Sequence, residues 1–538
     1  MSVPMLKAYF SAALRLLPAL LLLSLAVGLP AVPGAMLGPD HRGLAVEPAL
    51  ALAAGLIAAY AGWRPGRRCV AAAALLTLPV VLMRLADLVA QMVAGRPFQP
   101  AFDPALIPAL WDVLAASLHP LLLTLVVALI PGLLLGLLFL AFAGLMRPLA
   151  VPAGRRVALG VLLGALTLQL AGIEGFQPPA RGMVAAWRDQ GERWVAGREV
   201  KAHLAAALAE DPVGAIPPAE LLSALRGRPV VLAWVESYGL SALTDPRHEA
   251  VVAGRLSALE AALSASGFHA LTGLVESPVL GGRSWLAHGT LRAGIRQDQP
   301  VLQGAVLASG RPGLVNAFQG AGWHTVAAMP GLSGPWPEGA RWGFDLTLNR
   351  SAFPYEGPAF GWSPMPDQAL LAAVEQQVPL KPGQPLFLEM VLTSSHAPWT
   401  PLPSWREASV TALADGSAFA GADLAPDYLD MAGHYARSID YSLRALGDWL
   451  VRAVPDDALV LVLGDHPAVG WIADEAEGGH KVPLHILSRD PSLLQPLKGW
   501  GLVDGMLPEV TPDNPVIPMQ DLMEKLLNAY SGPRPRGV

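Results

Sequence analysis

Residues 458–470 read ALVLVLGDHPAVG, and this stretch decides the fold of the C-terminal part of the chain. Six apolar residues, 458–463, run directly into Gly464, Asp465 and His466. A short apolar run that ends at a glycine is typical of a buried strand followed by a turn. An acid and an imidazole directly after the strand also suit two metal ligands carried at the edge of a sheet. Both interpretations predict the strand, and the rest of the chain decides between them.

Similar short apolar runs recur from residue 229 onward, with helical patterns such as residues 249–267 and 434–454 between them. Apolar strands that alternate with amphipathic helices predict an α/β domain with a mostly parallel central sheet, covered by helices. The other runs are PVVLAWVE (229–236), HALTGLVES (269–277), WHTVAAM (323–329), PLFLEMVLTSSH (385–396) and VPLHILSRD (482–490).

Three of these runs end in side chains that suit metal binding or acid–base chemistry. Glu236 ends the first run and His396 ends a later one. Asp465 and His466 end the run quoted above. Since parallel sheets bind ligands at the carboxyl ends of their strands, we expect these residues to meet at one edge. Such a set, with one more oxygen, predicts a site for a divalent cation, Mn²⁺, Zn²⁺ or Mg²⁺, and leaves a second cation open.

The additional oxygen is predicted to come from Ser284, in the stretch GGRSWLAHGT (281–290). Two glycines allow close backbone approach, and the serine precedes a helix-like segment whose N-terminus would stabilise a bound anion. A serine next to a divalent cation becomes a nucleophile at neutral pH. Arg283 beside it would neutralise an oxyanion. The alternative is that Ser284 is a plain N-cap.

Four segments carry a resemblance to a known family: VLAWVESYG, GGRSWLAHGT, TSSHAPWTPLP and LVLGDH, in this order. Together they resemble the sulfatase-type branch of the alkaline phosphatase superfamily, across about residues 229–490. By layout the chain is similar to lipoteichoic acid synthase-like and phosphoethanolamine transferase-like enzymes. These enzymes join a five-helix membrane anchor to an extracytoplasmic catalytic domain, so the resemblance implies an alkaline phosphatase-like fold here.

The resemblance also implies roles for the residues around the metal. Glu236, Asp465 and His466 match metal ligands of the family, and Ser284 matches its metal-bound nucleophile. Sulfatases that mature a formylglycine use a C/S-x-P-x-R element, whereas SWLAH begins at Ser284 in this chain. Phosphate-ester chemistry is therefore favoured over sulfuric ester hydrolysis, which stays as an alternative.

On the substrate side, His396 matches the family's histidine that contacts the transferred group. His480, in GGHKVPLHILSRD, matches a position that faces the substrate. Trp399 lies three residues after His396 and either walls the pocket or packs in the core. The predicted substrate-binding set is Arg283, His480 and Trp399. His396 is predicted to be catalytic, because it would orient or protonate the departing or entering oxygen.

The N-terminal third is much more apolar than the rest and predicts a transmembrane bundle. Arginines gather in the loops after the second and fourth stretches, so the N-terminus is expected in the cytoplasm and the chain after about residue 175 outside. We therefore predict a five-span anchor (1–175), a helical linker (176–228) and a periplasmic catalytic domain (229–538) at a bacterial inner membrane. The five stretches are 9–32, 45–63, 69–93, 119–146 and 157–174.

Charge patterning excludes some partners and marks one pair. The formal net charge is -6, which offers no basic field for nucleic acid. Arg84 and Asp87 lie three residues apart within the third stretch, either as a mutually neutralising pair or as a functional site. The single cysteine, Cys69, excludes an intrachain disulfide.

The sequence thus predicts a membrane-anchored, metal-dependent phosphotransferase or phosphoric ester hydrolase. A phospholipid or envelope glycan is the expected substrate, because a membrane anchor holds enzyme and substrate at one surface. A catalytically inactive envelope protein that uses the domain for binding or assembly is the other alternative. Oligomeric state, donor and acceptor are left open.

Overall fold

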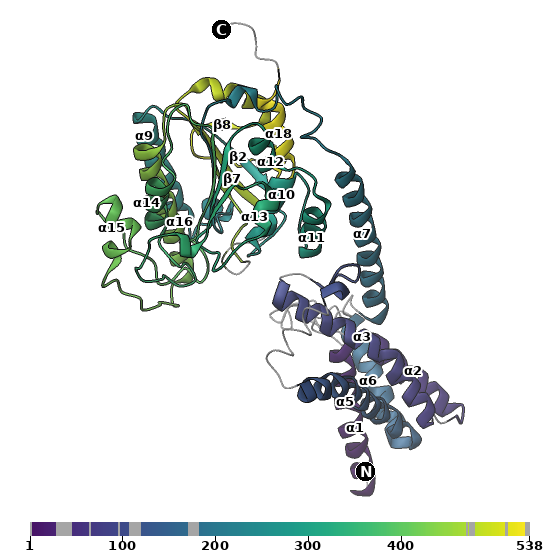
Figure 1. Ribbon diagram of the computed structural model, residues 1–538. Helices are drawn as coiled ribbons and strands as arrows, with labels where there is room; N and C mark the ends of the chain where they lie inside the picture. The colour runs from purple at the N-terminus through teal and green to yellow at the C-terminus, as the bar shows by residue number, and fades with distance from the viewer. Residues whose placement is uncertain are drawn as a thin grey trace. The chain divides into compact units, whose positions relative to one another are not determined.

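The computed structural model divides the chain into two compact units, Met1–His203 and Leu204–Val538, which are described separately (Figure 1). The boundary falls within helix α7 (Met183–Ala209). The residues that the structure describes are 3–27, 46–63, 66–94, 97–106, 120–170, 182–469, 472, 479–511 and 515–532.

The N-terminal unit is a bundle of helices with an apolar core of leucine and alanine side chains. Among the described residues, three helical segments are long and apolar enough to cross a membrane: Pro4–Val27, Arg67–Ala90 and Leu129–Ala150. A fourth apolar segment, Glu47–Tyr60, is shorter. The apolar anchor is thus confirmed in its coarse form, and five crossings remain a prediction. The helices are α1 (Val3–Val27), α2 (Val46–Tyr60), α3 (Arg67–Ala94), α5 (Pro120–Met146) and α6 (Pro152–Leu170).

The charged pair predicted in the third stretch lies on α3, and its acid binds the helix that leads out of the bundle. Arg84 and Asp87 are both buried. Asp87 Oδ1 lies 2.6 Å from Arg193 Nη1 of α7 and accepts a hydrogen bond from Gln190 Nε2 at 3.2 Å. The backbone N–H of Phe98 donates to the same oxygen. Asp87 therefore ties α7 to α3 within the N-terminal unit.

The C-terminal unit is built on a mixed sheet with the strand order β4-β3-β5-β1-β6-β7-β2-β8, and β9 pairs with β2. The strands β4, β3, β5, β1 and β6 run parallel to one another. By contrast, β7 runs antiparallel to both β6 and β2, and β8 runs antiparallel to β2. The strands are β1 (Val230–Val235), β2 (His269–Glu276), β3 (His324–Ala328), β4 (Leu346–Leu348), β5 (Leu386–Leu392), β6 (Leu459–Gly464), β7 (Lys481–Ser488), β8 (Val503–Asp504) and β9 (Val516–Pro518).

Each face of the sheet is covered by its own layer of helices (Figure 1). Alternate residues of β1 enter opposite cores: Val231 packs into one and Leu232 into the other. The first core also contains α9 (Glu249–Ala265), α14 (Asp367–Gln377) and α16 (Met431–Ala453). The second contains α10 (Ser284–Ala293), α11 (Pro300–Ser309), α12 (Leu314–Gly320), α13 (Glu338–Trp342) and α18 (Asp521–Tyr530). Short helices α8 (Ser241–Thr244) and α15 (Val410–Ala414) complete the first layer.

Candidate active site

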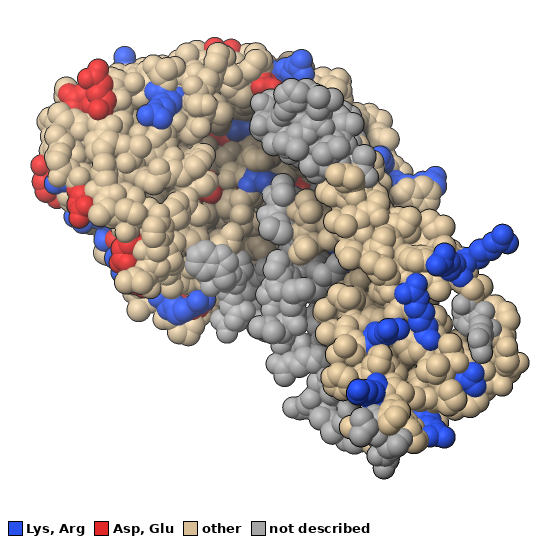
Figure 2. Space-filling view, turned by 90° about the horizontal axis from the view of Figure 1, so that it is seen from below, with Lys and Arg blue, Asp and Glu red and all other residues tan. Residues whose placement is uncertain are grey.

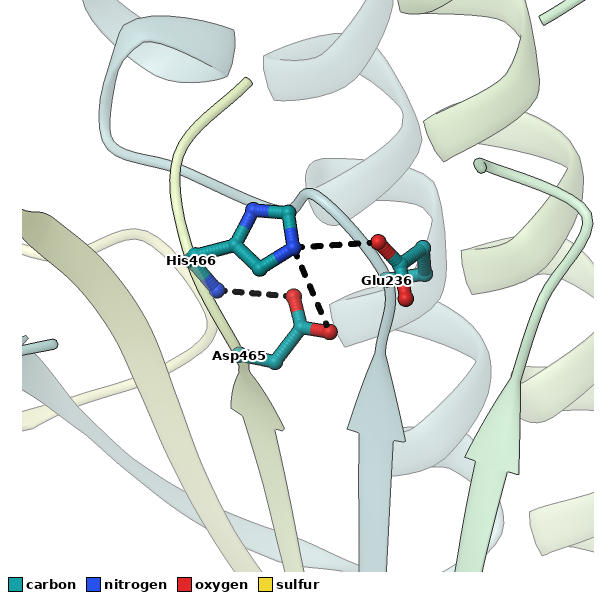
Figure 3. A group of neighbouring side chains, drawn as sticks. All are labelled: Glu236, Asp465 and His466. Atoms are coloured by element: carbon teal, nitrogen blue, oxygen red, sulfur yellow. Dashed lines mark hydrogen bonds and ion pairs between the residues drawn. The ribbon is translucent and has the colours of Figure 1, made fainter. Parts of the chain in front are cut away.

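Two neighbouring parallel strands, β1 and β6, deliver the two carboxylates of the site. The strands pair in register to their last residues, where Val235 lies opposite Gly464. The next residue on each strand is an acid, Glu236 or Asp465, so both acids leave the sheet at the same edge (Figure 3). Both side chains are almost fully buried. The structure therefore brings together the residues that the sequence placed at these strand ends.

His466 completes a group of three buried side chains. Its Nε2 lies 3.1 Å from Glu236 Oε1 (Figure 3). Its Nδ1 donates to the carbonyl oxygen of Pro467 at 2.9 Å, so Nε2 is the ring atom that faces the carboxylates. One ligand atom from each of Glu236, Asp465 and His466 lies within 4.8 Å of the others. Such a set of donors can hold a metal ion.

Asp465 has one oxygen engaged and one available. Its Oδ1 accepts hydrogen bonds from the backbone N–H groups of Ser237, at 2.8 Å, and His466, at 2.7 Å. Its Oδ2 is buried without a hydrogen-bond partner among the described residues. That oxygen lies 3.9 Å from His466 Nε2 and 3.9 Å from His288 Nε2. A buried carboxylate oxygen left in this state is costly, and a cation between these donors would satisfy it.

The electrostatics of the group also fit a cation. Burial raises the pKa of Asp465 to about 8, with the neighbouring Glu236 carboxylate adding to the effect. Burial alone would raise the pKa of Glu236 as well, but attraction to His466 outweighs it and lowers that pKa. Burial opposes protonation of His466, yet Asp465 and Glu236 together raise its pKa to about 9. Two buried carboxylates thus face one imidazole, and positive charge stabilises the group.

Ser284 is brought to this group by a tight turn at the start of α10. Gly281, Gly282 and Arg283 all have positive φ angles, of 66°, 130° and 63°. Ser284 Oγ donates to Glu236 Oε2 at 3.0 Å and lies 3.2 Å from His466 Nε2. No side chain caps the helix, and Leu286 N–H donates to the carbonyl oxygen of Arg283, so the N–H groups of Ser284 and Trp285 are the ones placed to face an anion.

Hydrogen bonds hold the loop that carries His396 against Glu236 and the first residue of α14. Ser395 Oγ donates to the carbonyl oxygen of Glu236 at 2.6 Å. Asp367, the first residue of α14, accepts hydrogen bonds from the N–H groups of Thr393, at 2.8 Å, and Ser394, at 3.1 Å. Asp367 was not predicted from the sequence, since its partners lie 26 and 27 residues away.

An exposed tryptophan stacks on His396, a contact that was not predicted from the sequence. The ring centroids of Trp362 and His396 are 3.8 Å apart, with 15° between the planes, and the tryptophan is 50% exposed. His396 itself is half-buried, and its Nδ1 lies 2.6 Å from the carbonyl oxygen of Ala397. The sequence around a loop tryptophan does not distinguish a residue of the site from a residue that packs in the core. This contact is therefore identified only by the fold.

The predicted substrate-binding residues lie around Glu236, Ser284, Asp465 and His466 rather than among them. Arg283 directly precedes Ser284, and one of its Nη atoms lies 3.5 Å from the carbonyl oxygen of Asp298. His480 Nδ1 lies 3.1 Å from the carbonyl oxygen of Ser277, whose hydroxyl bonds to the Asp465 carbonyl. Trp399 is only 3% exposed and donates from Nε1 to the carbonyl of Ser395, so it packs in the core beneath the His396 loop.

Comparison with known proteins supports the resemblance. Residues 259–491 match the model of the sulfatase family, which confirms the predicted kinship for that part of the chain. The match includes Ser284, His396, Asp465 and His466 but begins after Glu236. No curated protein matches the sequence.

Among solved structures, three similar ones are a synthase and two transferases. The lipoteichoic acid synthase LtaP from Listeria monocytogenes is 14% identical, with 57% of this chain and 74% of LtaP covered and a TM-score of 0.34. The phosphoglycerol transferase GacH from Streptococcus pyogenes, solved with sn-glycerol-1-phosphate, is 14% identical over 62% of this chain and 91% of GacH, with a TM-score of 0.35. The lipooligosaccharide phosphoethanolamine transferase EptA from Neisseria meningitidis is 13% identical over 86% and 84%, with a TM-score of 0.35. Likeness at this level does not assign a reaction to the chain.

Proposed function

We propose that this chain is a membrane-anchored, metal-dependent enzyme that transfers or hydrolyses a phosphate ester through a serine nucleophile. The observation that carries the proposal is the position of Ser284. Its Oγ lies 3.0 Å from Glu236 Oε2 and 3.2 Å from His466 Nε2, at the uncapped start of a helix. The match of residues 259–491 to the sulfatase family supports the same class of chemistry.

Glu236, Asp465 and His466 would hold one divalent cation, Mn²⁺, Zn²⁺ or Mg²⁺, with Ser284 Oγ as a further ligand. When bound, the cation lowers the pKa of the serine hydroxyl and offsets negative charge on the phosphate. The unpartnered Oδ2 of Asp465, and the position of His466 Nε2 between the two carboxylates, support this assignment. A second cation would need ligands beyond these residues.

The protein groups around Ser284 each have a task in the reaction. Ser284 Oγ forms a bond to phosphorus as the bond to the leaving oxygen breaks, and a phosphoserine results. Glu236 Oε2, at 3.0 Å, is the nearest acceptor for the hydroxyl proton. The N-terminus of α10 and Arg283 stabilise the phosphate oxygens. His396 orients or protonates the departing or entering oxygen. Water or an acceptor hydroxyl then takes the phosphoryl group from Ser284.

The substrate side of the proposal rests on residues around this group. His480 would face the non-reacting part of the substrate, and Arg283 its phosphate oxygens. Trp399 would contribute by holding the His396 loop, because it is buried. With five crossings and a cytoplasmic N-terminus, the catalytic unit would act in the periplasm on a phospholipid head group or an envelope glycan.

Trapping the covalent intermediate tests this proposal. The full chain is incubated with Mn²⁺, Zn²⁺ or Mg²⁺ and glycerophospholipid donors, and its intact mass is measured. A phosphorus-containing adduct is expected on Ser284. Ser284→Ala should abolish it and lower turnover roughly 10³-fold or more, because the nucleophile is gone.

Ser284→Thr is the matched control, because it keeps a hydroxyl at this position and should keep the adduct. A sulfate adduct formed from sulfate-ester donors would support the sulfuric ester alternative. A folded protein that binds none of the three cations and forms no adduct would contradict the enzyme proposal.

A further inference from the structure

A pocket of about 390 Å³ opens between helices of the N-terminal unit, far in sequence from the candidate active site. Its walls are mostly apolar and include Ala59, Phe139 and Met146. Two arginines also line it: Arg67, the first residue of α3, and Arg147, which directly follows α5. The pocket therefore combines an apolar interior with two cations contributed by different helices.

A neighbouring groove of about 190 Å³ continues from this pocket. The two share Trp63, Val70 and Met146 as lining residues, so they lie side by side along the bundle. The groove contains Cys69, which is exposed and is the single cysteine of the chain. An elongated apolar chain that enters the pocket can thus extend past Cys69 and shield its thiol from labelling.

The charge at this end of the bundle is positive and uncompensated. Neither Arg67 nor Arg147 has an ion-pair partner within the described part of the chain, and both are exposed. The sequence has no Asp or Glu in residues 1–23, 58–75 or 139–162. In Figure 2, blue side chains lie on the bundle at the right of the view, and no red carboxylate is visible beside them.

Two nearby arginines are already engaged, which distinguishes them from the pair in the pocket. Arg156 donates to the hydroxyl of Tyr9 at 2.8 Å. The guanidinium of Arg155 lies 5.5 Å from the ring centroid of Tyr60 and donates to a backbone carbonyl. By contrast, Arg67 and Arg147 line the pocket and have no such partner among the described residues.

We propose that this pocket binds one anionic phospholipid of the bilayer. Its phosphodiester lies between Arg67 and Arg147, because planar guanidinium groups recognise phosphate oxygens with paired hydrogen bonds. One acyl chain follows the apolar wall toward Val70 and Cys69. Basic pockets between membrane helices are suited to acidic lipid head groups. The site lies in the anchor, so this inference goes beyond the proposed catalysis and does not depend on it.

Thiol labelling of Cys69 tests the proposal in the full chain. The protein is reconstituted in nanodiscs of phosphatidylcholine alone or of an equal mixture with phosphatidylglycerol, and the rate of maleimide modification is compared. Phosphatidylglycerol should slow the reaction. The double variant Arg67→Gln/Arg147→Gln should remove the difference, and native mass spectrometry should show phosphatidylglycerol retained roughly fivefold less for each arginine neutralised.

Arg68→Gln is the matched control, since Arg68 is exposed and adjacent in sequence but does not line the pocket. It should keep the protection of Cys69 and the retained lipid. Equal loss in Arg68→Gln would mean general attraction of acidic lipid to the surface and would overturn the proposal. Identical labelling rates in the two lipid mixtures would overturn it as well, and so would equal protection by soluble glycerol phosphate in phosphatidylcholine nanodiscs.

Discussion

His288 is a buried titratable group near Asp465 that the proposed chemistry does not use. It lies one helical turn after Ser284, with its ring centroid 4.4 Å from that of Trp234. Its Nε2 is 3.9 Å from Asp465 Oδ2, too far for a hydrogen bond but within reach of a small side-chain shift. Burial lowers its pKa, which keeps the imidazole neutral. His288 is therefore placed to orient the Asp465 carboxylate.

Replacing this imidazole should weaken metal binding without unfolding the protein. We expect His288→Leu to lower the affinity for the divalent cation roughly 10- to 100-fold, because groups that orient metal ligands have effects of this size. Calorimetric titration of the metal-free protein measures it. His288→Gln keeps a polar group and should lose less. Unchanged affinity in a folded His288→Leu protein would show that Asp465 needs no such support.

Asp367 is the second residue whose importance becomes visible only in the fold. It accepts two backbone hydrogen bonds from Thr393 and Ser394 and one from the Ser442 hydroxyl, at 2.6 Å. Burial raises its pKa to about 6, although these hydrogen bonds act in the opposite direction. The side chain thus substitutes for missing backbone partners in the loop that leads to His396.

Substitutions at Asp367 should separate loop support from mere packing. Asp367→Ala leaves buried N–H groups without an acceptor, at a cost of about 1–3 kcal/mol for each, and should also lower turnover by loosening His396. Asp367→Asn keeps one oxygen for both N–H groups and should lose clearly less. Urea unfolding of the two variants checks the difference. Equal destabilisation by Ala and Asn would argue that the negative charge, and not the acceptor, is what matters.

Among the secondary-structure elements, the apolar runs predicted the positions of the strands well but the directions of the strands in the sheet only in part. The six runs coincide with β1, β2, β3, β5, β6 and β7. A continuous apolar run indicates that both faces of a strand are covered, and this holds equally for parallel and antiparallel neighbours. β7 nevertheless runs antiparallel to both β6 and β2, and no residue inside VPLHILS encodes that direction.

The same distinction applies to the candidate site. Glu236, Ser284, Asp465 and His466 could be chosen from sequence because each follows a strand or precedes a helix, and topology then places them together. Asp367 could not, because its role depends on tertiary hydrogen bonds to a distant loop. The short edge strands β4, β8 and β9 also escaped prediction, because two or three residues carry no detectable period.

A buried histidine on β7 makes the stability of the C-terminal unit depend on pH. His485 is fully buried between Tyr238 and Thr272, whose hydroxyls lie 3.2 Å from its Nε2 and 2.9 Å from its Nδ1. Burial lowers its pKa to about 3. Below about pH 6.5 the unfolded chain binds a proton that the folded chain does not, so the free energy of unfolding falls as the pH falls.

The contribution of His485 is expected to approach about 1.4 kcal/mol per pH unit between about pH 6 and pH 3. Urea unfolding at several pH values measures this slope. His485→Gln, which has no proton to bind in this range, should show a slope smaller by about one proton. Parallel slopes for the two proteins would show that His485 is not the group responsible.

At the scale of the whole molecule, both cores of the C-terminal unit lie inside Leu204–Val538. Leu204 and Leu208, at the end of α7, already pack against the second core. Earlier residues of α7, such as Arg193, are bound to the bundle through Asp87 instead. A shortened chain that starts at residue 204 should therefore unfold in one cooperative transition.

That shortened chain also offers a direct test of metal binding. At a cation concentration 100 times Kd, binding should stabilise the folded state by about 2.7 kcal/mol, seen as a rise in Tm. Removing the cation with a chelator should reverse the rise, and Asp465→Asn should largely prevent it. Identical Tm values with and without each cation, in a folded chain, would contradict the metal site. Failure to fold would instead show that the anchor is needed for stability.

The register of β1 and β6 makes the sheet itself the backbone of a chelating agent. Glu236 and Asp465 leave adjacent strands at one level, so the distance between their main chains is the inter-strand spacing of about 4.8 Å, set by peptide hydrogen bonds. The separation of the two carboxylates is therefore set by the strand spacing and not by the side-chain rotamers alone. A one-residue deletion in either strand would shift one carboxylate out of step and turn it to the opposite face. The site should thus tolerate core substitutions far better than changes of strand length.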